Sequence, residues 1–299
     1  MENALFGIDL GGTKIEGVVL KSKEDPSVLA RLRVPTEQEG GYDHILNQIV
    51  KVVKMLEQET GLRALRMGVA TPGTLDPLSG LHKNSNTTCL NGLPTKQDLE
   101  KKLGVEVRIA NDANCFAIAE ANMGAVKAAM PDAEVVFGVI MGTGVGGGVV
   151  VNGKVINGRH GIGGEWGHNF LDESGGLCYC GKVGCVEKVL GGPHLENYYK
   201  SLTGNHLSLK EIFNRLDTDE AARMVKARQI HFFGKAIAVI INVLDPDAIV
   251  LGGGVGNVDW LYTEGVAEVV KHIFNPRCDT VFLKPKLGDS AGVFGAALL

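Results

Sequence analysis

The feature that most constrains the fold is a glycine-containing pattern that occurs twice, at residues 6–20 and again at residues 137–151. Each copy consists of an apolar run, a glycine-rich turn and a second apolar run, which predicts two β-strands joined as a hairpin. The copies align in register at Phe6/Phe137, Gly7/Gly138, Gly11/Gly142, Gly17/Gly148, Val18/Val149 and Val19/Val150. A hairpin repeated at the start of each half of the chain indicates two related α/β domains.

Two other interpretations of these glycines are weaker than duplication. The hairpins could be unrelated, but the shared register and the threonine beside glycine in both turns, Thr13 and Thr143, favour a repeat. Residues 142–147 also match the dinucleotide pattern G-x-G-x-x-G, which requires a helix to follow at once. Residues 148–155 are instead β-branched and typical of a strand, so a Rossmann site is rejected. The chain also lacks the P-loop pattern G-x-x-x-x-G-K-[ST].

The rest of the chain alternates predicted strands and helices, which indicates an α/β fold. Composition and apolar spacing predict helices over residues 43–59, 113–123 and 219–244. Short apolar runs predict strands over residues 66–70, 105–110 and 248–251, the last of which enters a glycine turn.

Three of the six cysteines lie within eight residues, and a histidine precedes them. The spacing H-x9-C-x-C-x4-C is formed by His168, Cys178, Cys180 and Cys185. One imidazole and three thiolates make the soft tetrahedral ligand set that structural Zn2+ prefers. Glu165 and Glu187 bracket this group, and zinc has no need of them, so we expect the metal to position both carboxylates around a ligand. A zinc-ribbon interaction module is the alternative, and it leaves the paired glycine turns unexplained.

Asn111 and Asp112 lie between a predicted strand and a predicted helix. In open α/β sheets the ligand crevice lies outside the carboxyl ends of the strands, which places a carboxylate at this junction near a ligand. Asn and Asp are also favoured helix N-caps. Because the same chain carries two turns suited to phosphate and an ordered Glu/His/Glu segment, we predict that Asp112 is a base that accepts a proton from an attacking hydroxyl.

The composition excludes several classes of function. The net charge is −4 and the sequence has no run of Lys or Arg, which argues against nucleic acid and acidic membranes as partners. No signal peptide is recognisable, and no apolar run approaches the roughly 20 residues that span a bilayer. We therefore expect a cytoplasmic protein, in which clustered cysteines bind metal more often than they form disulfides. The scattered Cys89, Cys115 and Cys278 are expected to be small buried side chains.

Taken together, these residues resemble the ROK family of sugar kinases, a branch of the sugar kinase/hexokinase/actin superfold, over nearly the whole chain. The segments similar to family motifs are Asp9–Lys14, Gly142–Gly148, Asn111–Asp112, Gly164–His168, Cys178–Glu187 and Leu251–Gly254. The first two are similar to the two phosphate motifs, and the last is similar to the adenosine-side turn.

The resemblance implies a duplicated ribonuclease-H-like or actin-like ATPase fold, with two domains around a central cleft. The expected domains are a small N-terminal one, residues 1–112 plus 289–299, and a larger C-terminal one, residues 113–288, with a zinc-bound loop. The resemblance also implies a homodimer.

The resemblance further implies transfer of the γ-phosphoryl group of ATP to the primary hydroxyl of a hexose, with Mg2+. Asp112 is the expected base, and Asp9 is a candidate Mg2+ ligand. Expected ATP or phosphate contacts are Asp9, Gly11, Gly12, Thr13, Lys14, Gly142, Thr143, Gly144, Gly146, Gly147, Gly253 and Gly254. Expected sugar contacts are Asn86, Asn111, Asp112, Glu165, His168 and Glu187. Structural Zn2+ is expected on His168, Cys178, Cys180 and Cys185, with the second ring nitrogen of His168 facing a sugar hydroxyl.

Within the family, residues 84–92 and 164–169 are most similar to bacterial fructokinases of the manno(fructo)kinase type. Fructose is therefore the expected sugar, with mannose or glucose as further substrates. Cys89 departs from that pattern, in which an aromatic residue is expected. The alternatives are an N-acetylhexosamine kinase (for N-acetylglucosamine or N-acetylmannosamine) or a glucokinase of the same family. A non-catalytic sugar sensor is a more distant alternative, and it would be expected to lack Asp112 or the phosphate turns.

Overall fold

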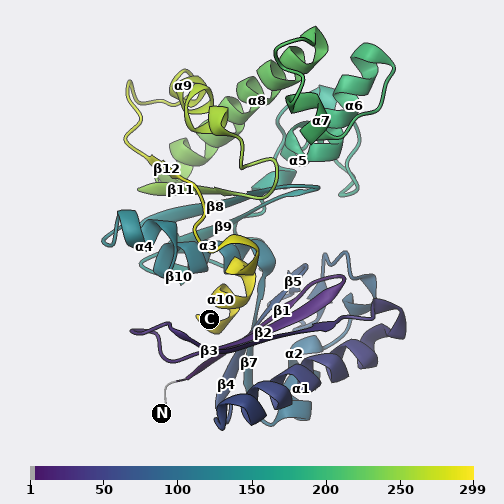
Figure 1. The fold of residues 1–299 in the computed structure, drawn as a ribbon, viewed down its shortest axis with the longest axis vertical. Coiled ribbons are helices and arrows are strands. Elements are labelled where there is room, and N and C mark those ends of the chain that lie inside the picture. Colours follow the sequence, from purple (N-terminus) through teal and green to yellow (C-terminus); the bar gives the residue numbers. More distant parts are fainter. Residues whose placement is uncertain (1–3) are drawn as a thin grey trace. The chain divides into compact units, whose positions relative to one another are not determined.

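The computed structural model describes residues 4–299, which form two five-stranded sheets with helices around them (Figure 1). The first sheet contains β1 (Leu5–Leu10), β2 (Lys14–Leu20), β3 (Val28–Pro35), β4 (Arg66–Thr71) and β7 (Glu106–Asn111). The second contains β8 (Val135–Met141), β9 (Val145–Val151), β10 (Lys154–Val155), β11 (Ala248–Gly252) and β12 (Val281–Leu283). A short pair is formed by β5 (Thr74–Leu75) and β6 (His82–Lys83). The α-helices are α1 (Gly41–Thr60), α2 (Thr95–Leu103), α3 (Asp112–Asn122), α4 (Ala125–Ala129), α5 (Val186–Leu190), α6 (Gly192–Thr203), α7 (Leu209–Phe213), α8 (Glu220–Leu244), α9 (Glu264–Val270) and α10 (Ala291–Ala297).

Both sheets begin with the hairpin that the repeated pattern predicts. The first sheet has the order β3-β2-β1-β4-β7, in which β1 and β2 are antiparallel and β4 is parallel to both β1 and β7. The second has the order β10-β9-β8-β11-β12, in which β11 is parallel to both β8 and β12. Counted from its own first strand, each sheet has the order 3-2-1-4-5. This shared topology confirms the predicted duplicated fold of the ribonuclease-H-like and actin-like class.

Helix α1 packs against the first sheet through the apolar stripe that its sequence predicts, which includes Ile45, Ile49 and Val52. The helix approaches β2 closely at Gly17, where an added Cβ would lie 2.4 Å from Val52 Cγ1. In the second copy of the pattern, a Cβ on Gly148 would lie 2.9 Å from the Cβ of Ala117 in α3. The glycine repeated in register therefore leaves room for a helix in both copies.

By compactness the chain divides into two units. Unit 1 comprises the described residues up to Ala128 together with 148–163 and 286–299, and unit 2 comprises 129–147 and 164–285. This division differs from the predicted domain boundaries, because residues 113–128 (which include α3), 148–163 and 286–288 belong to unit 1. The Glu120 carboxylate of α3 accepts hydrogen bonds from the backbone N–H groups of Lys286 (3.0 Å) and Leu287 (2.8 Å), which lead into α10.

Helix α8 is the one helix among residues 4–299 that is long and apolar enough to cross a bilayer by length and composition. Half of its most apolar window is buried, and it packs against α6 and α9 of unit 2. Its bounds follow the predicted signals, since the Asp219 side chain accepts from the Ala221 N–H at 2.9 Å and the helix ends before Asp245. The packing of α8 is that of a core helix.

Replacing Gly17 by alanine should destabilise the protein, because the new methyl group would overlap Val52 and Leu56. Overpacking a filled core costs about 1–3 kcal/mol, and we expect the free energy of unfolding to fall by that amount in urea titrations followed by circular dichroism. Gly254→Ala is the matched control, since a Cβ there meets no atom within 4 Å. Equal stabilities of Gly17→Ala and wild type would contradict this account of the packing.

Candidate functional site

Two carboxylates in unit 1 lie at the ends of strands of the first sheet. Asp9 lies near the end of β1, and Asp112 opens α3 directly after β7. Strands β1, β4 and β7 are parallel neighbours, so their carboxyl ends share one edge of the sheet. Asn111 caps α3, and the N–H of Ala113 donates to both Asn111 Oδ1 and Asp112 Oδ1 at 2.8 Å. Asn111 is therefore the N-cap, as predicted. The Ala113 N–H is shared by Asn111 and Asp112 and holds the Asp112 carboxylate in place.

Desolvation raises the pKa of both carboxyl groups, and of the two side chains Asp9 is partly buried whereas Asp112 is exposed to a ligand. For Asp9, desolvation is the main cause and the charges of Asp112 and Glu16 add to it, so that its pKa rises to about 7 although Lys14 lowers it. Desolvation also raises the pKa of Asp112, against hydrogen bonds that favour its charged form. A carboxylate whose pKa is raised binds a proton more strongly, which is a property required of a general base.

The first glycine turn lies beside these carboxylates, between β1 and β2. The N–H of Gly11 donates to the carbonyl of Lys14 at 3.0 Å, and Thr36 Oγ1 donates to the Gly11 carbonyl at 2.7 Å. Gly12, Thr13 and Lys14 are exposed. Turns with exposed successive N–H groups are suited to anions, so the structure keeps the predicted phosphate turn available to a ligand.

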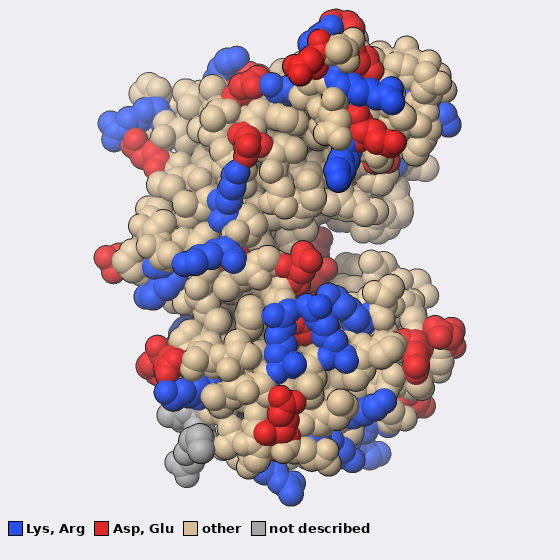
Figure 2. Space-filling view, viewed as in Figure 1, with Lys and Arg blue, Asp and Glu red and all other residues tan. Residues whose placement is uncertain are grey.

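Basic side chains gather around a buried glutamate next to this turn. Glu16 of β2 is 1% exposed and forms ion pairs with Lys14 (3.8 Å), Arg33 (2.9 Å) and Arg31. Figure 2 shows a cluster of Lys and Arg side chains over this sheet, whereas both signs of charge are interspersed over most of the visible face. The positive charge near the turn favours an anionic ligand.

The predicted sugar contact Asn86 lies in an ordered loop of unit 1. Its side chain is exposed, whereas the neighbouring Ser85 and Asn91 close the loop through two backbone–amide hydrogen bonds of 2.9 Å. Cys89 is partly buried and packs against the core of unit 1. Asn91 therefore shapes the segment that carries Asn86, and Cys89 contributes a side chain to the packing beneath it.

The four predicted zinc ligands come together in unit 2. His168 ends the 3-10 turn Trp166–His168, Cys178 and Cys180 lie on a tight turn, and Cys185 caps α5; their four ligand atoms lie within 4.8 Å of one another. The Sγ atoms of Cys180 and Cys185 are 3.6 Å apart, too far for a disulfide bond of about 2.05 Å. The separation is close to the roughly 3.8 Å between two thiolates on a tetrahedral zinc with Zn–S bonds of about 2.3 Å. The arrangement fits a structural zinc ion.

The thiols of this cluster need a cation in order to ionise together. Burial, followed by contacts with Cys180 and Cys178, raises the pKa of Cys185 to about 12. Backbone hydrogen bonding at Lys182 is the main cause that lowers the pKa of the exposed Cys180. A bound divalent cation supplies the positive charge that favours thiolates, as in other cysteine sites.

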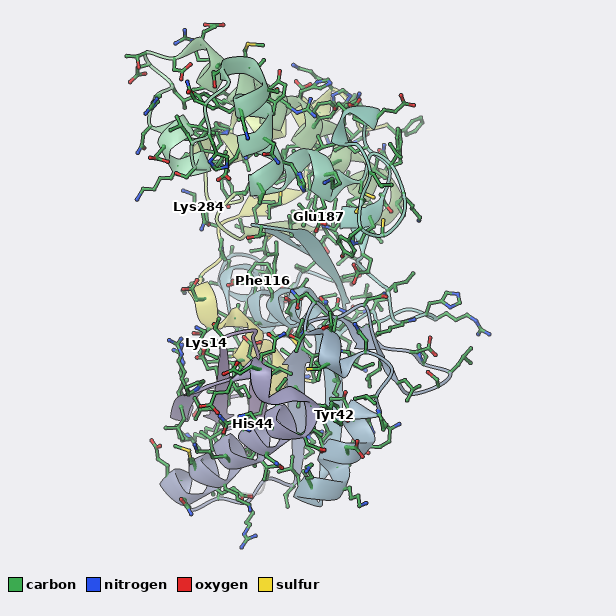
Figure 3. All side chains as sticks on the ribbon, turned by 90° about the vertical axis from the view of Figure 1, so that its right-hand side faces the viewer. Lys14, Tyr42, His44, Phe116, Glu187 and Lys284 are labelled. Carbon is green, nitrogen blue, oxygen red and sulfur yellow. The ribbon has the colours of Figure 1, made fainter. Side chains whose placement is uncertain are left out.

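Glu187 connects the cysteine loop, residues 168–185, to the second glycine turn. It lies in the first turn of α5, two residues after Cys185, and its Oε2 accepts from the N–H of Val145 at 3.0 Å. Val145 directly follows the turn, in which the Gly142 N–H donates to the Gly144 carbonyl at 2.9 Å. Figure 3 shows the labelled Glu187 beside the loop that carries the sulfur atoms. One carboxylate therefore joins the predicted metal site to the predicted phosphate turn.

Tyr179 is a residue of this site that the sequence analysis missed. Its hydroxyl lies 3.0 Å from Nε2 of His168, whose Nδ1 lies 3.7 Å from Cys178 Sγ. The second ring nitrogen of His168 thus contacts a tyrosine hydroxyl, and the prediction from the sequence was a sugar hydroxyl at this position. Desolvation and the charges of Glu187 and Glu165 raise the pKa of Tyr179 to about 12. The position of Tyr179 between the predicted ligands Cys178 and Cys180 was the feature of the sequence that could have identified it as a site residue.

The second phosphate turn is shorter than predicted. Gly146 and Gly147 lie inside β9, so they belong to the strand. Trp166 packs over them: its indole N–H donates to the Gly146 carbonyl at 2.8 Å, and a Cβ on Gly147 would lie 2.6 Å from the Trp166 ring. The turn itself consists of residues 142–144, and Gly147 leaves room for the Trp166 ring.

A further glycine turn follows β11 at the same edge of the second sheet. The neighbouring strands β8 and β11 are parallel and pair Ile140 with Gly252, so the turns after them lie side by side. The Val255 N–H donates to the Met141 carbonyl at 2.9 Å, and Gly253 has a φ of 81°. Unit 2 therefore brings together residues 142–144, Gly253, Gly254 and the cysteine loop. The other predicted site residues, Asp9, Gly11–Lys14, Asn86, Asn111 and Asp112, belong to unit 1.

Comparisons with known proteins cover nearly the whole chain. The profile of the ROK family matches residues 5–299. The N-acetyl-D-glucosamine kinase of Histophilus somni (strain 129Pt) is 36% identical over 306 residues, which cover 98% of this chain and 98% of that protein. A ROK hexokinase structure from Thermus thermophilus has a TM-score of 0.87 at 32% identity, covering 99% of this chain and 97% of that chain. A ROK family glucokinase from Streptomyces griseus in complex with glucose and AMPPNP has a TM-score of 0.76 at 25% identity, covering 99% and 98%.

Replacing Asp9 by asparagine should stabilise the protein increasingly as the pH rises. The pKa of Asp9 is raised from an ordinary value of about 3.9 to about 7, so its contribution to stability is present below pH 4 and is lost as the pH rises through 7. The neutral amide avoids this loss. At about 1.4 kcal/mol per pKa unit, we expect Asp9→Asn to exceed wild type by about 2–4 kcal/mol at pH 8 and by little at pH 4, in urea unfolding without Mg2+.

The matched control is Asp43→Asn, because the Asp43 side chain is 84% exposed. It should leave the pH dependence as in wild type. A stability difference between Asp9→Asn and wild type that stays constant from pH 4 to pH 8 would show that Asp9 ionises normally in the folded state.

Proposed function

We propose that this chain, which belongs to the ROK family, is an ATP-dependent kinase that phosphorylates the primary hydroxyl of N-acetylglucosamine. Membership in the family and full-length similarity to sugar kinases make the chain a sugar kinase. The observation that carries the choice of sugar is the 36% identity to an N-acetyl-D-glucosamine kinase over 98% of both proteins.

Asp112 is the proposed catalytic base. Phosphoryl transfer depends mainly on alignment and on charge stabilisation, so the base must hold the attacking hydroxyl in place and take its proton late in the reaction. The Ala113 N–H holds one oxygen of the Asp112 carboxylate, and desolvation raises the pKa of Asp112, which strengthens it as a base. Asn111, fixed by the same donor, is proposed to contact the sugar.

Asp9 and the glycine turns are the proposed ATP site. Backbone N–H groups of Gly11–Lys14 and of Gly142–Gly144 would bind phosphate oxygens, and the turn at Gly253 and Gly254 would contact the adenosine side. Asp9 would hold the Mg2+ that accompanies ATP, and the ion would neutralise charge on the phosphates. A carboxylate whose proton is held by burial and by like charges becomes a good cation ligand once the cation supplies the opposite charge.

The cysteine loop is proposed to be a zinc-stabilised frame for sugar recognition. Zinc on His168, Cys178, Cys180 and Cys185 would have all four positions filled by protein, so it would play no part in the chemistry. Glu165, Glu187 and Asn86 would bind sugar hydroxyls, because carboxylates and amides match pairs of hydroxyl donors and acceptors. His168 would be limited to the metal and to Tyr179, which we add as a candidate sugar contact.

Fructose is the second candidate substrate. Residues 84–92 and 164–169 carry the similarity to fructokinases, and the Ser85–Asn91 hydrogen bonds show that the first of these segments is an ordered loop. The sequence motifs are most similar to those of fructokinases, but the full-length similarity to several N-acetyl-D-glucosamine kinases favours the N-acetylhexosamine alternative. A homodimer, a cytoplasmic location and the lack of nucleic-acid partners stay predictions.

A panel of sugars in a coupled assay of ADP release tests the substrate. With N-acetylglucosamine, N-acetylmannosamine, glucose, mannose and fructose at equal concentration, we expect N-acetylglucosamine to have the highest kcat/KM. An advantage of at least about 10-fold corresponds to about 1.4 kcal/mol of preferential transition-state binding. A higher kcat/KM for fructose would replace the first candidate by the second, and no sugar-dependent ADP release would contradict the kinase itself.

Asp112→Asn should abolish most of the activity while leaving the nucleotide bound. Removing a general base typically lowers kcat by about 10²–10⁴-fold, and the amide keeps the shape of the side chain. We expect this loss in the coupled assay, with an unchanged dissociation constant for a non-hydrolysable ATP analogue. Asp43→Asn on the exposed face of α1 should retain wild-type kcat. Wild-type kcat in Asp112→Asn would remove Asp112 from the mechanism.

A further inference from the structure

Unit 2 carries a second group of metal-type ligands, built by helices α8 and α9. His231 lies in α8, Glu268 in α9, and His272 two residues after the end of α9. His231 Nδ1 and His272 Nε2 each lie 3.1 Å from the same atom, Glu268 Oε1. All three ligand atoms lie within 4.8 Å of one another. Two imidazoles and one carboxylate thus converge on a single point.

The packing of the two helices brings Glu268 to this point. A Cβ on Gly234 would lie 2.4 Å from Glu268 Cγ and 2.9 Å from its backbone, so α9 can pack against α8 here only because residue 234 is glycine. Gly234 lies three residues after His231, on the same face of α8. Glu268 and His272 are four residues apart and share a face in the same way.

The surroundings of the Glu268 carboxylate leave one of its two oxygens available to a metal. Lys271 Nζ contacts the other oxygen, Oε2, at 2.6 Å, which leaves Oε1 facing both imidazoles. Such a partner orients a ligand carboxylate from outside the coordination sphere. The side chains are 49% exposed for His231, 28% for His272 and 13% for Glu268, so an ion can enter from solvent.

We propose that His231, Glu268 and His272 form a binding site for a divalent transition metal of the zinc type. Imidazole and carboxylate suit Zn2+ and its neighbours in the first transition row. Ligand atoms around a tetrahedral zinc with bonds of about 2.0–2.1 Å lie about 3.3 Å apart, close to the two distances of 3.1 Å found here. The ion would link α8 to the end of α9, with water in the remaining position, and it would be separate from the cysteine loop.

The competing explanation is a polar network without metal, in which Glu268 accepts hydrogen bonds from the ring N–H groups of His231 and His272 and from Lys271. The two explanations differ in zinc stoichiometry. The test is equilibrium dialysis of the reduced full-length chain against a series of buffered Zn2+ concentrations, with metal analysis of the bound fraction. We expect the affinity of one bound zinc equivalent to fall by at least about 100-fold in His231→Ala and in Glu268→Gln. At Zn2+ concentrations that just saturate wild type, each variant should therefore bind one equivalent less than wild type.

Two controls locate the additional equivalent. His206→Ala removes an exposed histidine of another loop and should bind zinc as wild type does. Cys180→Ser should lose the cysteine-loop zinc and keep this one; Co2+ loaded into that variant should show ligand-field bands that disappear on adding Glu268→Gln. His231→Gln replaces His231→Ala if the alanine variant does not fold. Equal zinc stoichiometry and affinity in wild type, His231→Ala and Glu268→Gln would overturn the proposal and favour the polar network.

Discussion

The hydrogen bond from the Val145 N–H to the Glu187 carboxylate is the interaction on which the candidate site of unit 2 depends. Glu187 follows the N-cap Cys185 of α5, and Val145 follows the glycine turn of residues 142–144. Trp166, two residues before His168, adds a second connection through its hydrogen bond to Gly146. These two hydrogen bonds connect the cysteine loop to the turn proposed to hold phosphate.

In unit 1 the corresponding constraint is the placement of two carboxylates at the edge of a parallel sheet. The parallel pairing of β1, β4 and β7 places Asp9 and Asp112 at the ends of their strands, and desolvation raises the pKa of each. The raised pKa of Asp9 costs stability near neutral pH. Such a cost is expected where a carboxylate must act as a base or bind a cation.

Much of this arrangement was predictable, because it rests on local patterns. The repeated glycine pattern predicted both hairpins, the Asp219 and Asp245 signals predicted the bounds of α8, and cysteine spacing predicted the four-residue cluster. Features set by tertiary packing were missed. Tyr179 belongs to the site because its hydroxyl lies beside His168. The Gly146 carbonyl accepts a hydrogen bond from Trp166, and Gly147 leaves room for its ring. Helix α3 belongs to unit 1, where Glu120 accepts from the Lys286 N–H. His231 and Glu268 are 37 residues apart and meet only because α9 packs at Gly234.

The central claim is that a metal in the cysteine loop orders the residues that bind the sugar. The most direct test is the dissociation constant of N-acetylglucosamine, measured by calorimetry before zinc removal, after chelation, and after zinc is restored. Loss of groups that orient a site typically weakens binding by about 10–100-fold, and we predict a loss of that size that zinc reverses. Unchanged sugar affinity in protein shown to be free of zinc would contradict the account.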